Sequence, residues 1–288
     1  MIWDDHEIRD NWSAIEGAGA DLFDRQILDI GKAVSREYQR QLWGSVLGDD
    51  SSASEFHYHR FGILGVVFLD QRGGRESTAS SGTPYLGRQQ WARLTAALGP
   101  GGLLTDVVHL VVAGAIPLAF LPEGFTRAAA VLLSDMRDQW SHVPFRPERI
   151  RLLELCRQWQ SAQPGREVTF VAGDAHIGMT TEILFRGEAL FRQLVSSPVA
   201  SVVLPGLVEQ ALRKLCAGTI SMGGGYELRH LEWEGRANFG VLDISRNRGA
   251  SGTALRLCAE DRALPVLEEA ISPPAPPGRE GKPGRAGN

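Results

Sequence analysis

Cysteine is scarce in this chain of 288 residues, which has only Cys156, Cys216 and Cys258. Their odd number and wide spacing fit neither a disulfide framework nor a zinc site built from cysteine pairs. Long apolar runs are also few. The longest, VVHLVVAGAIPLAFL at residues 107–121, is shorter than a membrane-spanning helix requires and contains a histidine, a glycine and a proline. We therefore expect buried, inert thiols in a reducing compartment and no membrane span.

An excess of basic charge is missing as well. The sequence has 30 Lys and Arg against 34 Asp and Glu, for a net charge of -4. We therefore expect no basic surface that binds nucleic acid or an anionic membrane. It has no G-x-S-x-G motif, which disfavours a metal-independent hydrolase with a serine nucleophile. The acidic N-terminus has no apolar signal-peptide core, which predicts a cytoplasmic location if the true start of the protein lies near Met1.

The composition that is present, 43% hydrophobic and 22% charged, is typical of a globular protein. The pattern mixes helices with buried strands, which predicts an α/β or α+β sandwich with layered sheets. The tail 272–288 is rich in Pro and Gly without a large apolar residue, so we expect a domain at 1–271 followed by a disordered tail. Helices are expected at 19–44, 87–98, 146–160 and 208–215, and strands at 61–69, 107–113, 167–172, 179–185, 189–195, 228–233, 239–244 and 254–258.

Two short stretches carry the residue types of a metal site. WDDHE presents Asp5 and His6 after a short apolar stub, and VTFVAGDAHIG is a strand that ends at a glycine and continues into Asp174 and His176. Ligands of open sheets bind at the carboxyl ends of the strands, so these side chains are expected to meet there. Two carboxylate and imidazole pairs suit a site for two divalent or trivalent cations.

Each stretch also has a purely structural interpretation. Asp4 or Asp5 could cap a helix. Asp174 could accept backbone N–H groups in a turn, and His176 could be a hydrogen-bonded core residue. A purely structural role for both stretches at once is the disfavoured interpretation, because each stretch follows a strand-like element.

Together the two stretches resemble the third and last motifs of the PhoD-like branch of the metallophosphoesterase (calcineurin-like) superfamily. The intervening pieces follow in the same order: FGILGVVFLDQRGGRE resembles a strand that ends in an acid and two arginines, LGRQQWARL a helix, and DQWSHVPFRPERIRLL an aspartate–tryptophan segment with its helix. The resemblance covers about residues 1–262. It implies a partial four-layer αββα sandwich with mixed sheets.

The resemblance also implies a dinuclear metal site. Asp5, Asp174 and His176 would be metal ligands, with iron, calcium, zinc and manganese not distinguished. His6 would lie beside the scissile phosphate and stabilise charge or donate a proton.

Arg72 and Arg75 would hold the phosphate of the substrate, because a guanidinium matches phosphate oxygens with two parallel hydrogen bonds. The alternative is that both belong to an exposed loop without a role. Three tryptophans, Trp91, Trp140 and Trp159, are expected in the core rather than as platforms for substrate.

Two motifs of the superfamily, Asp-x-His and Gly-Asp, precede the part that WDDHE matches, and they are not found ahead of it here. This predicts the C-terminal portion of a PhoD-like domain with Met1 as an internal methionine, and weak metal binding. The favoured function is a metal-dependent phosphoester hydrolase, an alkaline phosphatase or phosphodiesterase that acts on a small-molecule or polymer phosphate ester, with a dinuclear site that is expected to be incomplete in this chain. The alternative is a non-catalytic fragment or pseudoenzyme that serves as a binding module.

Overall fold

A large mixed sheet dominates the computed structural model, which describes residues 4, 22–39, 55–73, 85–131, 136, 139–199, 204–247 and 250–259. Eight strands form this sheet in the order β1-β2-β3-β4-β6-β5-β8-β7, and β9 and β10 form a separate two-stranded sheet. The strands are β1 (His57–Phe61), β2 (Leu64–Phe68), β3 (His109–Ala113), β4 (Glu167–Ala172), β5 (Gly178–Phe185), β6 (Glu188–Val195), β7 (Thr219–Gly223), β8 (Tyr226–Glu234), β9 (Asn238–Asn247) and β10 (Ala250–Ala259).

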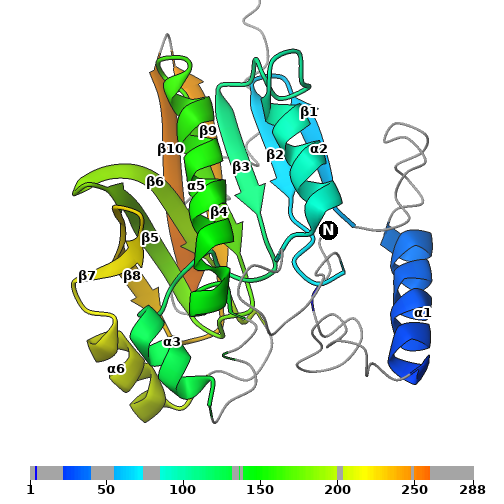
Figure 1. Cartoon of the computed structure of the whole chain (residues 1–288). Coiled ribbons are helices and arrows are strands. Elements are labelled where there is room, and N and C mark those ends of the chain that lie inside the picture. The colour runs from blue at the N-terminus through cyan, green and yellow to red at the C-terminus, as the bar shows by residue number, and fades with distance from the viewer. Residues whose placement is uncertain are drawn as a thin grey trace, which may run out of the picture.

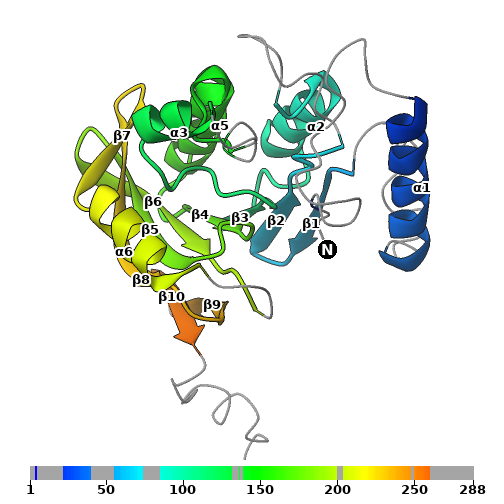
Figure 2. The same ribbon diagram turned by 90° about the horizontal axis from the view of Figure 1, so that it is seen from below.

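The helices lie mainly on one face of the large sheet. Figures 1 and 2 show α2 and α5 along that face and the β9–β10 hairpin on the opposite face, which gives layers of helix, sheet and small sheet. No helix within the described ranges is long and apolar enough to cross a bilayer. The helices are α1 (Leu22–Gln39), α2 (Arg88–Leu98), α3 (Glu123–Ala129), the short 3-10 helix η4 (Val143–Phe145), α5 (Arg146–Ser161) and α6 (Gly206–Leu215).

The centre of the sheet is parallel. Strands β2, β3, β4 and β6 run in one direction, whereas β1, β5, β8 and β7 pair antiparallel with their neighbours. All five residues of β3 are buried, as expected for a strand covered on both faces. Since parallel strands end at the same edge, the loops after β2, β3 and β4 lie next to one another.

The core fills the space between the sheet and its helices. Its strand residues include Leu110 of β3 and Phe170 of β4. Trp91, Trp140 and Trp159 are 2%, 1% and 4% exposed, which confirms that they are core residues.

The three cysteines are free and buried. Burial raises the pKa of the Cys156 thiol to about 12 and that of the Cys216 thiol to about 11. Because the thiolate is the reactive form, these thiols are inert at neutral pH, as the sequence predicted.

Some elements differ from the sequence prediction. The apolar stretch 61–69 is not one strand but the end of β1, a turn and β2; Gly62 turns the chain with a φ of 59°, in the left-handed region that favours glycine. The short elements α3 and β7 were not predicted. The predicted domain boundary at residue 271 and the tail 272–288 lie outside the described residues.

Candidate functional site

The loop after β4 carries two of the predicted site residues in an unusual backbone conformation. Asp174 and His176 have φ values of 59° and 54°, in the left-handed region that residues with a Cβ seldom adopt. Hydrogen bonds hold the loop: the Gly173 amide donates to the carbonyl of Ala115 at 3.0 Å, and the His176 amide donates to Ser197 Oγ at 3.3 Å. Backbone strain of about 1–3 kcal/mol per residue is found most often at ligand and catalytic sites.

The loop after β2 is organised by the buried carboxylate of Asp70. This carboxylate accepts hydrogen bonds from the backbone amides of Arg72 at 3.1 Å, Gly73 at 2.6 Å and Glu55 at 2.7 Å. The side-chain amide of Gln90 in α2 accepts from the Asp70 amide at 2.9 Å and donates to the Asp70 carbonyl at 2.8 Å. The loop is therefore fixed both to itself and to α2, and Arg72 leaves it in a defined direction.

The next residue, Gln71, joins this loop to the loop after β3. Its side-chain amide donates to the Ile116 carbonyl at 3.1 Å and accepts from the Ile116 amide at 2.8 Å. A Cβ on Gly114 would lie 2.7 Å from Gln71 Oε1, so this contact requires glycine at position 114. The loops after β2 and β3 are thus locked together.

Arg72 is the centre of the site. Its Nε lies 2.8 Å from Asp4 Oδ1, and its Nη2 lies 3.7 Å from Asp174 Oδ1. The side chain of Arg72 is 3% exposed, against 25% for Asp4 and 16% for Asp174. The other carboxylate oxygen of Asp174 accepts a hydrogen bond from Gln139 Nε2 at 3.0 Å. Four segments that are distant in the sequence therefore supply one polar and charged cluster, which we call the Arg72 cluster (Asp4, Arg72, Gln139 and Asp174).

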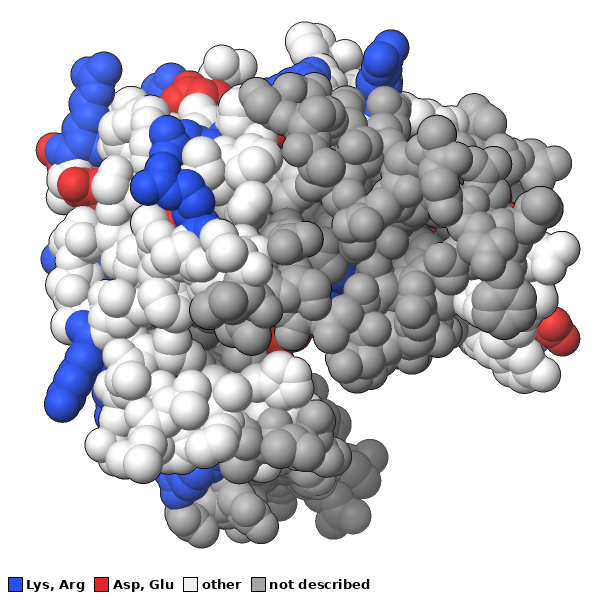
Figure 3. Space-filling view, turned by 60° about the horizontal axis from the view of Figure 1, so that its bottom comes forward, with Lys and Arg blue, Asp and Glu red and all other residues white. Residues whose placement is uncertain are grey.

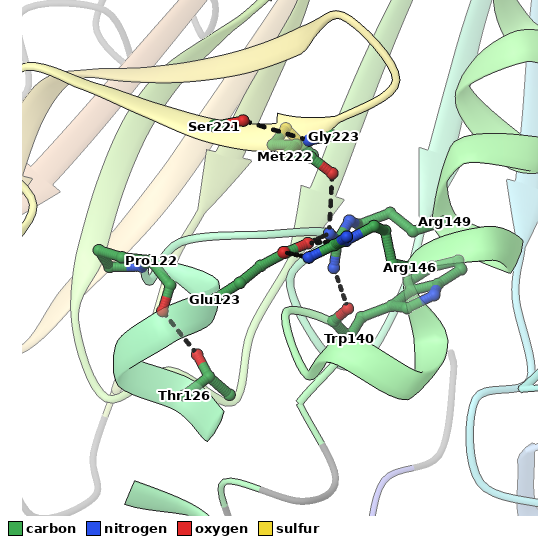
Figure 4. Close-up of polar contacts among 9 residues, drawn as sticks. All are labelled: Pro122, Glu123, Thr126, Trp140, Arg146, Arg149, Ser221, Met222 and Gly223. Carbon is green, nitrogen blue, oxygen red and sulfur yellow. Dashed lines mark hydrogen bonds and ion pairs between the residues drawn. The ribbon is translucent and has the colours of Figure 1, made fainter. Parts of the chain in front are cut away.

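A buried arginine supports the segment that carries Gln139. Arg149 of α5 donates hydrogen bonds to the carbonyl of Trp140, to the carboxylate of Glu123 and, at 3.1 Å, to the carbonyl of Met222 (Figure 4). It thereby connects the 139–142 loop with α3, α5 and β7. Because Gln139 precedes Trp140 directly, this network positions the amide that contacts Asp174.

The structure brings part of the predicted site together. Arg72 and Asp174 face each other, and His176 lies on the same loop as Asp174. The other predicted site residues, Asp5, His6 and Arg75, lie outside the described residues. Sequence reasoning missed Asp4 as the acid that contacts Arg72, although WDDHE contains it, and it missed Gln139, which has no motif around it.

The described side chains fit part of a metal centre. Within the part of the chain that the structure describes, no group of three or more His, Cys, Asp or Glu could by itself hold a metal ion. The donor types do fit: Asp4 and Asp174 offer carboxylates and His176 an imidazole, which are ligands of hard and intermediate divalent cations. One buried guanidinium contacts two carboxylates, so the summed formal charge of Asp4, Arg72 and Asp174 is negative.

A structure of PhoD superimposes on the chain with a TM-score of 0.59 and 15% sequence identity, over 88% of this chain and 50% of that chain. The chain has a PhoD-like fold. This confirms the resemblance seen in the motifs and the expected mixed α/β class. The chain spans about half the length of the PhoD chain that it matches. No protein-family model matches it, and no curated protein does.

On the face shown in Figure 3, described basic side chains are scattered among uncharged and acidic ones rather than joined in one surface.

Proposed function

We propose that this chain acts as a metal-dependent phosphoester hydrolase, an alkaline phosphatase or phosphodiesterase of the PhoD-like type. The observation that carries the proposal is the contact of Arg72 with Asp4 and Asp174 at the carboxyl ends of β2 and β4. A buried guanidinium beside carboxylates suits the binding of a phosphate next to cations, because both signs of charge are needed there. The substrate class is a small-molecule or polymer phosphate ester.

Asp5, Asp174 and His176 would hold the metal ions. Bound cations would supply Lewis-acid charge to the phosphate and lower the pKa of water, so that hydroxide is available as the nucleophile at neutral pH. Gln139 assists by donating to Asp174 Oδ2 at 3.0 Å, which orients the carboxylate. Iron, calcium, zinc and manganese all agree with these donor types.

Arg72 and Arg75 would hold the phosphate oxygens. The contact of Arg72 Nε with Asp4 fixes the plane of the guanidinium, and its positive charge offsets the charge of the phosphate in the transition state. His6, two residues after Asp4, would donate a proton to the oxygen of the leaving group.

The experiment is a hydrolysis assay of the 288-residue chain with Mn²⁺, Fe²⁺, Ca²⁺ or Zn²⁺, using p-nitrophenyl phosphate and bis(p-nitrophenyl) phosphate. We expect Asp174→Asn and His176→Asn to lower kcat/KM at least about 100-fold, more than the usual loss from a residue that only supports a metal ligand. Asp243→Asn on β9 is the matched control, because its side chain is 51% exposed and 3.9 Å from Arg256.

Metal content measured on the same samples separates the alternatives. Turnover of neither ester by a chain that binds metal would favour the binding module over the hydrolase. Turnover that is unchanged in both Asp174→Asn and His176→Asn would place the active site elsewhere.

A further inference from the structure

A groove lies on the helix-covered face of the sheet. It has a volume of about 1200 Å³ and is lined by α2, by the loop 99–103 and by residues at the start of α5. Figure 1 shows α2 and α5 on the same face of the sheet. No residue of the Arg72 cluster lines this groove, so any ligand of the groove makes contacts of its own.

Small and apolar side chains form much of the lining. The exposed positions of α2 that border the groove are Arg88, Ala92, Thr95 and Ala96. The last three have short side chains and leave space above the helix. Leu103, 50% exposed, and Pro147 add apolar surface. The volume is above the range of about 300–1,000 Å³ that is usual for sites of small ligands. There is thus room for an apolar chain.

The charged side chains that line the groove differ in their hydrogen bonding. The guanidinium of Arg151 stacks on the ring of Trp91 with Cζ 4.2 Å from the centroid. Among the residues that the structure describes it forms no hydrogen bond or ion pair, although its charge interacts with that of the nearby Glu148 carboxylate. The neighbouring carboxylate of Glu148 is already engaged. It accepts hydrogen bonds from the indole N–H of Trp91 and from the backbone amides of Tyr85 and Leu86.

Arg151 therefore presents its N–H groups to the groove while Glu148 is directed toward the protein. Arg88 adds a second guanidinium to the lining. Stacking on Trp91 orients the guanidinium plane of Arg151 and leaves its edge available, which is the geometry in which arginine binds a carboxylate or phosphate with two hydrogen bonds.

We propose that this groove binds a soluble amphipathic anion, with its carboxylate or phosphate on Arg151 and its apolar chain over Ala92, Ala96 and Pro147. The charge complementarity favours an anion over a neutral or cationic molecule of the same length. A free amphiphile fits better than a bilayer surface, because among the described lining residues Leu103 is the one large apolar side chain that is highly exposed. Docking on a bilayer would need several such side chains around the rim.

The test is isothermal titration of the 288-residue chain with decanoate, with decyl phosphate and with decyltrimethylammonium, each below its micelle concentration. Both anions are expected to bind and the cation is not. Arg151→Gln is expected to weaken binding of the anions about 10-fold or more, as the loss of a hydrogen bond to a charged group implies. Ala96→Trp fills the groove from an exposed helix position and is expected to abolish binding. Arg127→Gln, on the exposed side of α3, is the matched control.

Thermal melting of each variant shows whether it is folded, and Arg151→Gln changes an exposed residue. Equal affinity of the anions for wild type and for folded Arg151→Gln and Ala96→Trp overturns the proposal. So does equal affinity for the cation, because the groove would then be merely apolar. Binding to phosphatidic acid vesicles without binding of either free anion would also overturn it, in favour of a lipid surface.

Discussion

Replacing Arg149 with methionine should destabilise the protein strongly, because its guanidinium is fully buried and has three partners. The change removes one hydrogen bond to the Glu123 carboxylate and two to the backbone carbonyls of Trp140 and Met222. Glu123 keeps Arg146 as a partner, but the two buried carbonyls lose their donor at about 1–3 kcal/mol each, so the total cost is about 3–5 kcal/mol. Each kcal/mol lowers Tm by about 2–4 °C in a domain of this size, so Tm should fall by about 10 °C.

Arg146→Met is the matched control, since Arg146 pairs with the same carboxylate but its side chain is 44% exposed. An exposed pair contributes about 0–1 kcal/mol, so Tm should change little. The assay is thermal unfolding followed by circular dichroism, for the wild type and both variants. Equal losses in the two variants, or no loss in Arg149→Met, would refute the argument that burial decides the cost.

Three further predictions concern the side chains of His109, Asp70 and Arg72. Burial lowers the pKa of His109, so protonation of this histidine favours the unfolded state. The free energy of unfolding should therefore fall as the pH drops below 6.5. Urea titrations at several pH values should show a smaller fall in His109→Gln than in the wild type. Asp70→Ala should cost about 3 kcal/mol in the same denaturation experiment, because it leaves three backbone amides without their acceptor. Arg72→Lys should weaken inhibition by inorganic phosphate about 10-fold, since lysine cannot offer paired hydrogen bonds, and inhibition constants measure this.

The loop that carries Asp174 and His176 could be predicted from the sequence because its signals are local. An apolar strand that ends at Gly173 and continues into an acid and a histidine is a pattern of adjacent residues, and the structure places these residues directly after β4. Arg72 could be predicted as a site residue for the same reason, because it lies shortly after β2.

The partners of those residues could not be predicted, because they come from distant parts of the chain. Gln139 contacts Asp174 and Gln71 contacts Ile116 through single polar groups, which leave no periodic pattern. The turn at Gly62 was missed for a different reason: the residues around it are apolar on both sides, so strand propensity continued through it.

The topology of the sheet also bears on the order in which the protein folds. The hairpins β5–β6, β7–β8 and β9–β10 join strands that are neighbours in the sequence, whereas β2, β3 and β4 pair in parallel across connections that contain α2 or α5. Closing long connections is slow because chain entropy is lost before contacts form. Arg72 and Asp174 meet only when β2, β3 and β4 have all paired. In refolding experiments, strand formation followed by circular dichroism should therefore precede the recovery of the phosphate binding that we propose, so that the Arg72 cluster assembles last.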